Sequence, residues 1–64
     1  SFEIITKIRY HRELDSYSII QAGYKYVFPA VLLDDFKDYV RKHHLVRGWY
    51  EMHRDVVKRI SVYS

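Results

Sequence analysis

Residues 17–44 read YSIIQAGYKYVFPAVLLDDFKDYVRKHH, and the pattern of apolar side chains changes inside this stretch at Pro29. Before the proline, β-branched and aromatic residues dominate, as they do in strands. After it, apolar residues recur with the 3.6-residue period of a helix. Proline favours an extended residue before it and tolerates a helix start just after it. The sequence therefore predicts a strand over residues 17–28 followed by a helix over residues 30–44.

Charges along the predicted helix agree with its direction. Acidic side chains come early and basic ones late, which complements the helix dipole, and His44 is expected to cap the C-terminal end. One apolar stripe should face the core. Its members are Leu32, Leu33, Phe36, Tyr39, Val40 and His43.

Residues 2–12 alternate between apolar and polar side chains, which predicts a strand with one buried face. Residues 13–16 are polar enough to turn the chain, so this strand should form a hairpin with the strand over residues 17–28. Gly23 lies inside the second strand and suggests a bulge there. The outer face of this hairpin is expected to carry Ile5, Lys7, Arg9, His11, Tyr17, Ile19, Lys25 and Val27.

The last segment admits two interpretations after Gly48 breaks the chain. A helix over about 49–61 places Trp49, Met52, His53, Val56, Val57 and Ile60 on one side. The β-branched residues near its end also fit a second hairpin. The helix matches more positions and is preferred, and it puts Trp49 in the core. The expected class is α+β: an N-terminal antiparallel hairpin packed on a helix, followed by a second helix or, as the alternative, a second hairpin.

Length and composition allow a single small domain spanning residues 1–64. Ser1 is not a usual first residue, so we expect the chain to be a fragment or processed product of a longer protein. With no cysteine to form disulfides, ten Tyr and Phe residues and Trp49 must supply the core. The lack of cysteine fits a reducing compartment, so an intracellular location, cytoplasmic or nuclear, is expected. No apolar run approaches the roughly 20 residues that cross a bilayer, and no membrane role is expected.

Catalytic and metal sites are not predicted. Adjacent histidines such as His43 and His44 point about 100° apart on a helix and do not suit one metal ion, for which i,i+4 spacing is typical. Asp34 and Asp38 share a helix face, but the helix dipole accounts for them without a catalytic role. No Gly-rich phosphate loop or nucleophile turn occurs. We expect a protein that is not an enzyme and needs no cofactor.

Basic residues interleaved with aromatic ones give the first functional hypothesis, a nucleic-acid-associated binding module. The chain has 11 basic and 8 acidic residues, net charge +3 and a pI near 9.3. Cations on a sheet face can bind phosphates, while an exposed ring can stack on a base of DNA or RNA. The expected phosphate contacts are Lys7, Arg9, Lys25, Arg41, Lys42 and Arg47, with Tyr17 as the stacking residue.

The alternative hypothesis is a protein-interaction or homodimerisation module. Ile5, Ile19 and Val27 are apolar residues on a hairpin face expected to meet water. An apolar patch rimmed by charge is typical of a surface that contacts a partner. Convergence of the cations on one surface would favour the nucleic-acid hypothesis, whereas an apolar patch among scattered charges would favour a protein partner.

Overall fold

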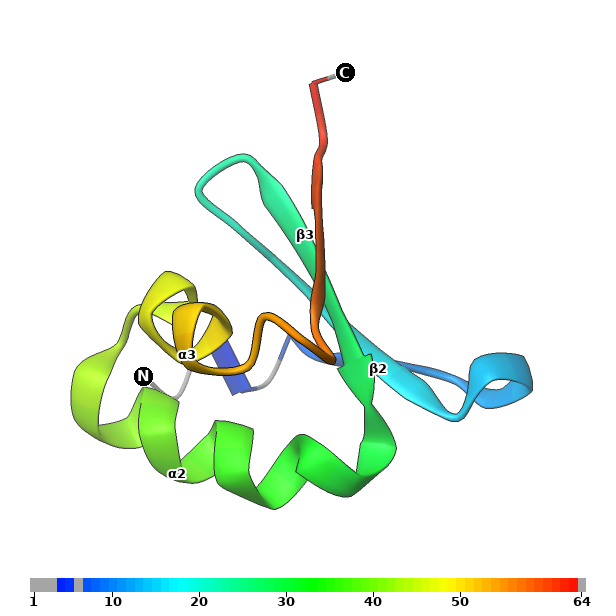
Figure 1. The fold of residues 1–64 in the computed structure, drawn as a ribbon, viewed down its shortest axis with the longest axis horizontal. Coiled ribbons are helices and arrows are strands. Elements are labelled where there is room, and N and C mark those ends of the chain that lie inside the picture. The colour runs from blue at the N-terminus through cyan, green and yellow to red at the C-terminus, as the bar shows by residue number, and fades with distance from the viewer. Residues whose placement is uncertain (1–3, 6, 64) are drawn as a thin grey trace.

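A four-stranded antiparallel sheet in the order β1-β2-β3-β4 carries two helices, α2 and α3, on one side (Figure 1). The computed structural model describes residues 4–5 and 7–63. The elements in chain order are β1 (Arg9–His11), η1 (Arg12–Leu14), β2 (Ser16–Gln21), β3 (Tyr24–Pro29), η2 (Ala30–Leu32), α2 (Leu33–His43), α3 (Val46–Met52) and β4 (Lys58–Ser61). The predicted α+β class, with an antiparallel hairpin and two helices, is confirmed.

The predicted first strand over residues 2–12 is corrected to a strand of three residues, β1. Residues 2, 3 and 6 lie outside the described part of the chain, and residues 4–5 are helical. The helical geometry lets Ile4, Ile5 and Ile8 all pack against the core. A strand could not do this, because neighbouring side chains in a strand point to opposite faces.

The predicted strand over residues 17–28 is itself a hairpin, made of β2 and β3. The two-residue turn between them consists of Ala22, with φ 52°, and Gly23, with φ 81°. Positive φ at both central residues matches the twist of the flanking strands in a tight hairpin turn. Gly23 therefore marks a turn instead of the expected bulge, and the sheet gains a strand.

Ala22→Asn is expected to stabilise the protein by roughly 0.5–1 kcal/mol, because asparagine tolerates the left-handed region better than alanine. Gly23→Ala should have the opposite effect, since its new Cβ would lie 2.8 Å from the Tyr63 ring. The free energy of unfolding from urea titrations measures both variants. A loss of stability in Ala22→Asn would contradict this turn geometry.

The predicted helix over residues 30–44 is confirmed, as the short 3-10 helix η2 running into α2. Pro29 is extended, with ψ 145°, and ends β3 just before the helical segment. His44 caps the C-terminal end in the left-handed conformation, and its N–H donates to the Val40 carbonyl. Among the described residues, no helix has the length and apolar character needed to cross a bilayer.

The last segment contains the predicted second helix, but with other bounds than residues 49–61, and it does not form a second hairpin. The helix α3 begins before Gly48 and ends at Met52, and β4 follows it and pairs with β3. Gly48 lies inside α3 because α2 and α3 approach closely there: a Cβ on Gly48 would overlap the Tyr39 hydroxyl. The segment Lys58–Ser61 thus extends the existing sheet, where β3 still offers a free edge.

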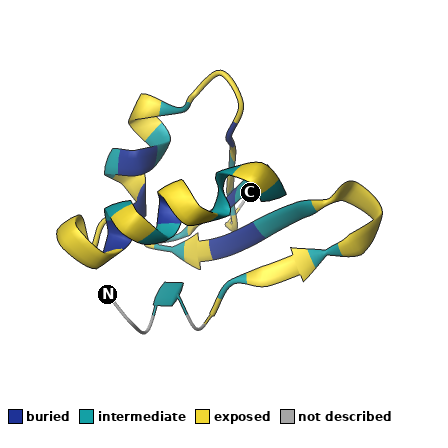
Figure 2. Cartoon of the chain, turned by 90° about the horizontal axis from the view of Figure 1, so that it is seen from below, coloured by how far each residue is buried: buried dark blue, intermediate teal, exposed yellow. Residues whose placement is uncertain are grey.

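The core lies between the sheet and the two helices, as the buried positions in Figure 2 show. Trp49 is at its centre and packs edge-on against Phe28 and Phe36, with ring centroids 5.0 Å away in both cases. Its indole N–H donates to Asp35 Oδ2 at 2.8 Å. The predicted core position of Trp49 is confirmed, since the residue is fully buried.

The connection between β1 and β2 is closed by a hydrogen bond of 2.7 Å from the Tyr10 hydroxyl to Asp15. This bond, helped by desolvation and by the negative charge of Asp15, raises the pKa of Tyr10 above its usual 10.0. A raised folded-state pKa means that the contact stabilises the fold below the usual pKa. That contribution is lost as the pH rises through the raised value.

Asp15→Asn is expected to move the pKa of Tyr10 back toward its usual value, because the charged acceptor is gone. Asparagine also tolerates the left-handed conformation of residue 15, with φ 47°. An NMR titration of the Tyr10 ring measures the change. An unchanged titration curve in the variant would show that the contact does not form in solution.

Candidate nucleic-acid interface

The sheet has one face covered by helices and one face, here called the outer face, turned away from them. The register fixes which residues share each face: Tyr17 pairs with Phe28 and Ile19 with Tyr26 on the core side. Successive residues of a strand point to opposite faces. The outer face therefore carries Arg9, His11, Ser16, Ser18, Ile20, Lys25, Val27, Lys58 and Ile60.

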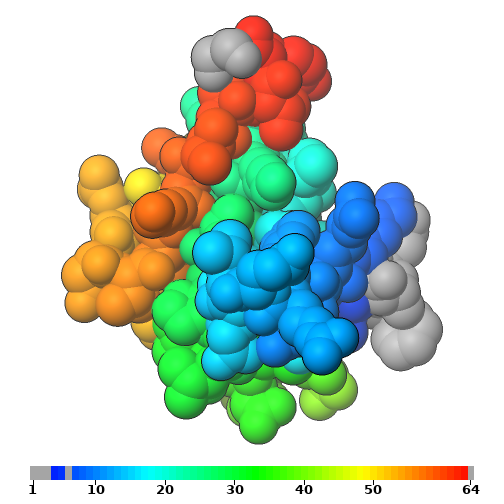
Figure 3. Space-filling view, turned by 90° about the vertical axis from the view of Figure 1, so that its right-hand side faces the viewer, coloured from blue at the N-terminus to red at the C-terminus, as the bar shows by residue number. Residues whose placement is uncertain are grey.

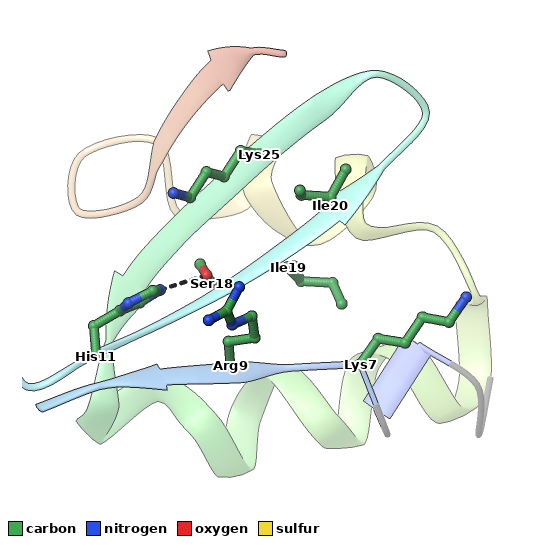
Figure 4. A pocket seen from close by; sticks show the side chains of 7 residues that line it. All are labelled: Lys7, Arg9, His11, Ser18, Ile19, Ile20 and Lys25. Atoms are coloured by element: carbon green, nitrogen blue, oxygen red, sulfur yellow. Dashed lines mark hydrogen bonds between the residues drawn. The ribbon is translucent and has the colours of Figure 1, made fainter.

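A hollow of about 260 Å³ opens on the outer face, and we call it the basic hollow (Figure 4). Figure 4 shows Arg9, His11 and Ser18 directed toward one another across β1 and β2, with Lys25 beyond them on β3. None of the described residues that line it is acidic. The lining consists of Lys7, Arg9, His11, Ser18, Ile19, Ile20 and Lys25.

Two cations of the basic hollow form no ion pair with a carboxylate within residues 4–5 and 7–63: Arg9 and Lys25. His11 Nε2 and the Ser18 hydroxyl are hydrogen-bonded at 2.6 Å and form a polar wall beside them. Cations gathered without a carboxylate attract anions, and a guanidinium binds phosphate oxygens in a fork.

A second hollow of about 280 Å³ adjoins the first, and we call it the apolar hollow. Its lining is Leu14, Ser16, Val27, Phe28, Pro29, Val56 and Lys58. The two hollows meet where Ser18 of the basic hollow pairs with Val27 of the apolar hollow in the β2–β3 ladder. The outer face thus joins a cationic area to an apolar one that also contains a lysine.

Three of the predicted phosphate contacts, Lys7, Arg9 and Lys25, come together in the basic hollow. The others lie on the helices: Arg41 and Lys42 in the last turns of α2, and Arg47 in α3. Lys42 lines a different hollow, which also contains Asp35 and Asp38. The basic hollow does not include the cations of the helical layer. Convergence on one surface, which would favour the nucleic-acid hypothesis, is therefore found for the hairpin residues alone.

The structure corrects the face expected for Tyr17 and Ile19. Directly paired residues share a face of the sheet, and Arg9 pairs with Ser18. The neighbours of Ser18 in β2, Tyr17 and Ile19, therefore point to the opposite face, toward the helices. Ile19 is 3% exposed in the core. Tyr17 packs between Tyr10 and Phe28, on the face opposite the basic hollow, where it does not meet a base bound to Arg9.

The apolar residues predicted as a partner surface are likewise divided. Ile5 packs against the core from the N-terminal helical turn, and Ile19 is a core residue. Val27 does lie on the outer face, where it lines the apolar hollow. These three residues do not form one exposed patch.

Lys58 is an outer-face cation that was not among the predicted phosphate contacts. The available sign of a strand was the strand preference of the β-branched residues in this segment, Val56, Val57, Ile60 and Val62. In the structure Lys58 pairs with Val27 across the β3–β4 ladder.

The remaining polar cluster joins α2 to the end of α3. Asp35 accepts the indole N–H of Trp49, and its Oδ2 lies 3.3 Å from His53 Nε2. His53 Nδ1 is 3.0 Å from the Trp49 carbonyl, and the two rings stack. These contacts tie the two helices together around the core tryptophan. Within residues 4–5 and 7–63, no three His, Asp or Glu side chains are grouped so as to hold a metal ion.

Comparison of the chain with protein-family models, with curated proteins and with solved structures finds no match. The function of the outer face must therefore be inferred from its own residues.

Proposed function

We propose that this protein is a small, non-enzymatic binding module that contacts the phosphates of DNA or RNA through the outer face of its sheet. The observation that supports this most strongly is the basic hollow, where Arg9 and Lys25 converge from different strands and no described lining residue is a carboxylate. Lys7 lies beside them at the sheet edge, and Lys58 adds a further charge on β4.

The spread of these charges favours a chain of phosphates over one small anion. At about 4.8 Å between strands, the cations from β1 to β4 span roughly 14 Å. The basic hollow, about 260 Å³, is smaller than the roughly 300–1,000 Å³ of pockets that enclose small ligands. An extended polyanion can contact all four strands, whereas a small ligand would use one hollow.

Of the three residues predicted to form a homodimer surface, only Val27 lies on the outer face. The exposed side chains of Ile20 and Ile60 lie on the same face. The positions of Lys25 and Lys58 among these residues oppose self-association, because two copies of this face would bring like charges together. We expect the protein to sediment as a monomer. A dimer that buries the outer face would contradict the proposed function.

The affinity for a fluorescently labelled single strand, measured by anisotropy over a range of salt concentrations, tests the proposal. With Lys7, Arg9, Lys25 and Lys58 each neutralising one phosphate, the slope of log K against log salt should be about −3, from roughly −0.7 per phosphate. Absence of binding to DNA and RNA at low salt, or an affinity that salt does not change, would overturn the proposed function.

A further inference from the structure

We propose that the apolar hollow receives an unstacked base of a single strand whose phosphate lies in the basic hollow, so that the protein binds single strands in preference to duplex. This inference rests on the proposed function and specifies the form of nucleic acid that the outer face accepts. Three features support it: the adjacency of the two hollows, the chemistry of the apolar walls, and the absence of acidic side chains among the described residues of both linings.

Adjacency is set by the β2–β3 register. Ser18, in the basic hollow, and Val27, in the apolar hollow, are direct partners on the outer face. Directly paired residues have Cβ atoms about 5 Å apart. A phosphate held by Arg9 and Lys25 would therefore lie within the reach of one nucleotide from the apolar hollow.

The walls of the apolar hollow suit the flat face of a base. Leu14 and Val56 are 70% and 47% exposed, so their side chains are open to a ligand, and Pro29 and Val27 complete an apolar floor. The Ser16 hydroxyl is already committed as a donor to the Leu14 carbonyl, at 3.0 Å. Contact with a base would then be apolar and tolerant of its identity.

The positive charge of the two hollows favours a nucleotide over an apolar peptide. Lys58 lies in the lining of the apolar hollow itself, and Arg9 and Lys25 lie in the lining next to it. Neither lining contains a carboxylate within the part of the chain that the structure describes, so a partner gains most if it offers an apolar surface and negative charge together. A nucleotide with an exposed base has both, whereas the bases of a duplex are stacked inside it and cannot enter the hollow.

The test compares the double variant Leu14→Ser with Val56→Ser against the wild type. Three probes of equal length, about 12 nucleotides, are used: a mixed-sequence single strand, its duplex, and a single strand with abasic sites throughout its centre. Val31→Ser with Leu45→Ser is the matched control, because both residues are exposed apolar side chains elsewhere on the molecule. All measurements use the same salt concentration.

We expect the wild type to bind the single strand about five to ten times more tightly than the duplex or the abasic strand. The Leu14 and Val56 variant should lose this preference through weaker binding to the ordinary single strand, with its affinity for the abasic strand and its salt slope unchanged. The control variant should behave as the wild type does.

Equal wild-type affinity for ordinary and abasic strands would overturn the inference while leaving the proposed phosphate contacts in place. A variant that weakens binding to all three probes alike would overturn it as well, because the hollow would then not act on the base. Absence of binding to every probe would remove the proposed function together with this inference.

Discussion

Trp49→Ala is expected to lower the free energy of unfolding by about 3–5 kcal/mol, as large aromatic truncations in a core do. A domain of 64 residues has a total stability of only about 3–10 kcal/mol at 0.05–0.15 kcal/mol per residue. The variant should therefore be largely unfolded or close to it. The cavity would remove the edge-on contacts with Phe28 and Phe36 and leave Asp35 without its indole donor.

Far-UV circular dichroism during urea denaturation is the appropriate measurement, because Trp49 is the single tryptophan and its fluorescence disappears in the variant. Trp49→Phe separates two contributions, since it keeps a ring between Phe28 and Phe36 and loses the hydrogen bond to Asp35. We expect the free energy of unfolding of Trp49→Phe to lie between those of the wild type and Trp49→Ala. Val31→Ala is the control, since Val31 is 87% exposed and should cost less than about 0.5 kcal/mol. A Trp49→Ala protein as stable as this control would contradict the core described above.

Neutralising the basic hollow gives the largest expected effect on binding. Arg9→Gln combined with Lys25→Gln should weaken binding to a single strand about thirtyfold at low salt, if each lost charge-assisted contact is worth about 1 kcal/mol. The salt slope should become shallower by about 1.4, which is two phosphates at roughly 0.7 each. Neither side chain forms an ion pair within the described residues, so the fold should tolerate both changes.

Arg41→Gln combined with Lys42→Gln is the matched control, because it also removes one arginine and one lysine, in this case from exposed positions in the last turn of α2. A site on the outer face predicts that this control binds within about threefold of the wild type, with the same salt slope. Anisotropy titrations measure both double variants, with thermal unfolding to verify that each is folded. Equal losses in the two variants would show that binding depends on net charge alone, and would contradict a site at the basic hollow.

The helix after Pro29 could be predicted because its determinants are local. Its apolar period, its early acidic residues and the proline before it act within one or two turns, and the structure retains all of them. The short turn at Ala22 was harder to recognise, since Gly23 alone fits a bulge as well as a turn, and the neighbouring Ala22 is not a residue that usually adopts positive φ.

Prediction of the candidate site required knowing which face of the sheet each side chain points to, and local sequence does not set this. Lys7, Arg9 and Lys25 were placed on one face by alternation, and they do line one hollow. Tyr17 and Ile19 were placed beside them by the same argument. The β1–β2 register, in which Arg9 pairs with Ser18, turns both toward the core, because a shift of one residue moves a whole strand face to the other side.

The sequence by itself determined the α+β class, the helix after Pro29, the aromatic core around Trp49 and the excess of positive charge, because propensity, period and composition are properties of short segments. The tertiary structure alone decided that residues 58–61 become a strand on the free edge of β3, that Gly48 lies within a helix against Tyr39, and that Lys58 joins the outer face. These outcomes depend on which backbone edge or side chain is available from a distant part of the chain. That availability is set only when the sheet and the helices pack together.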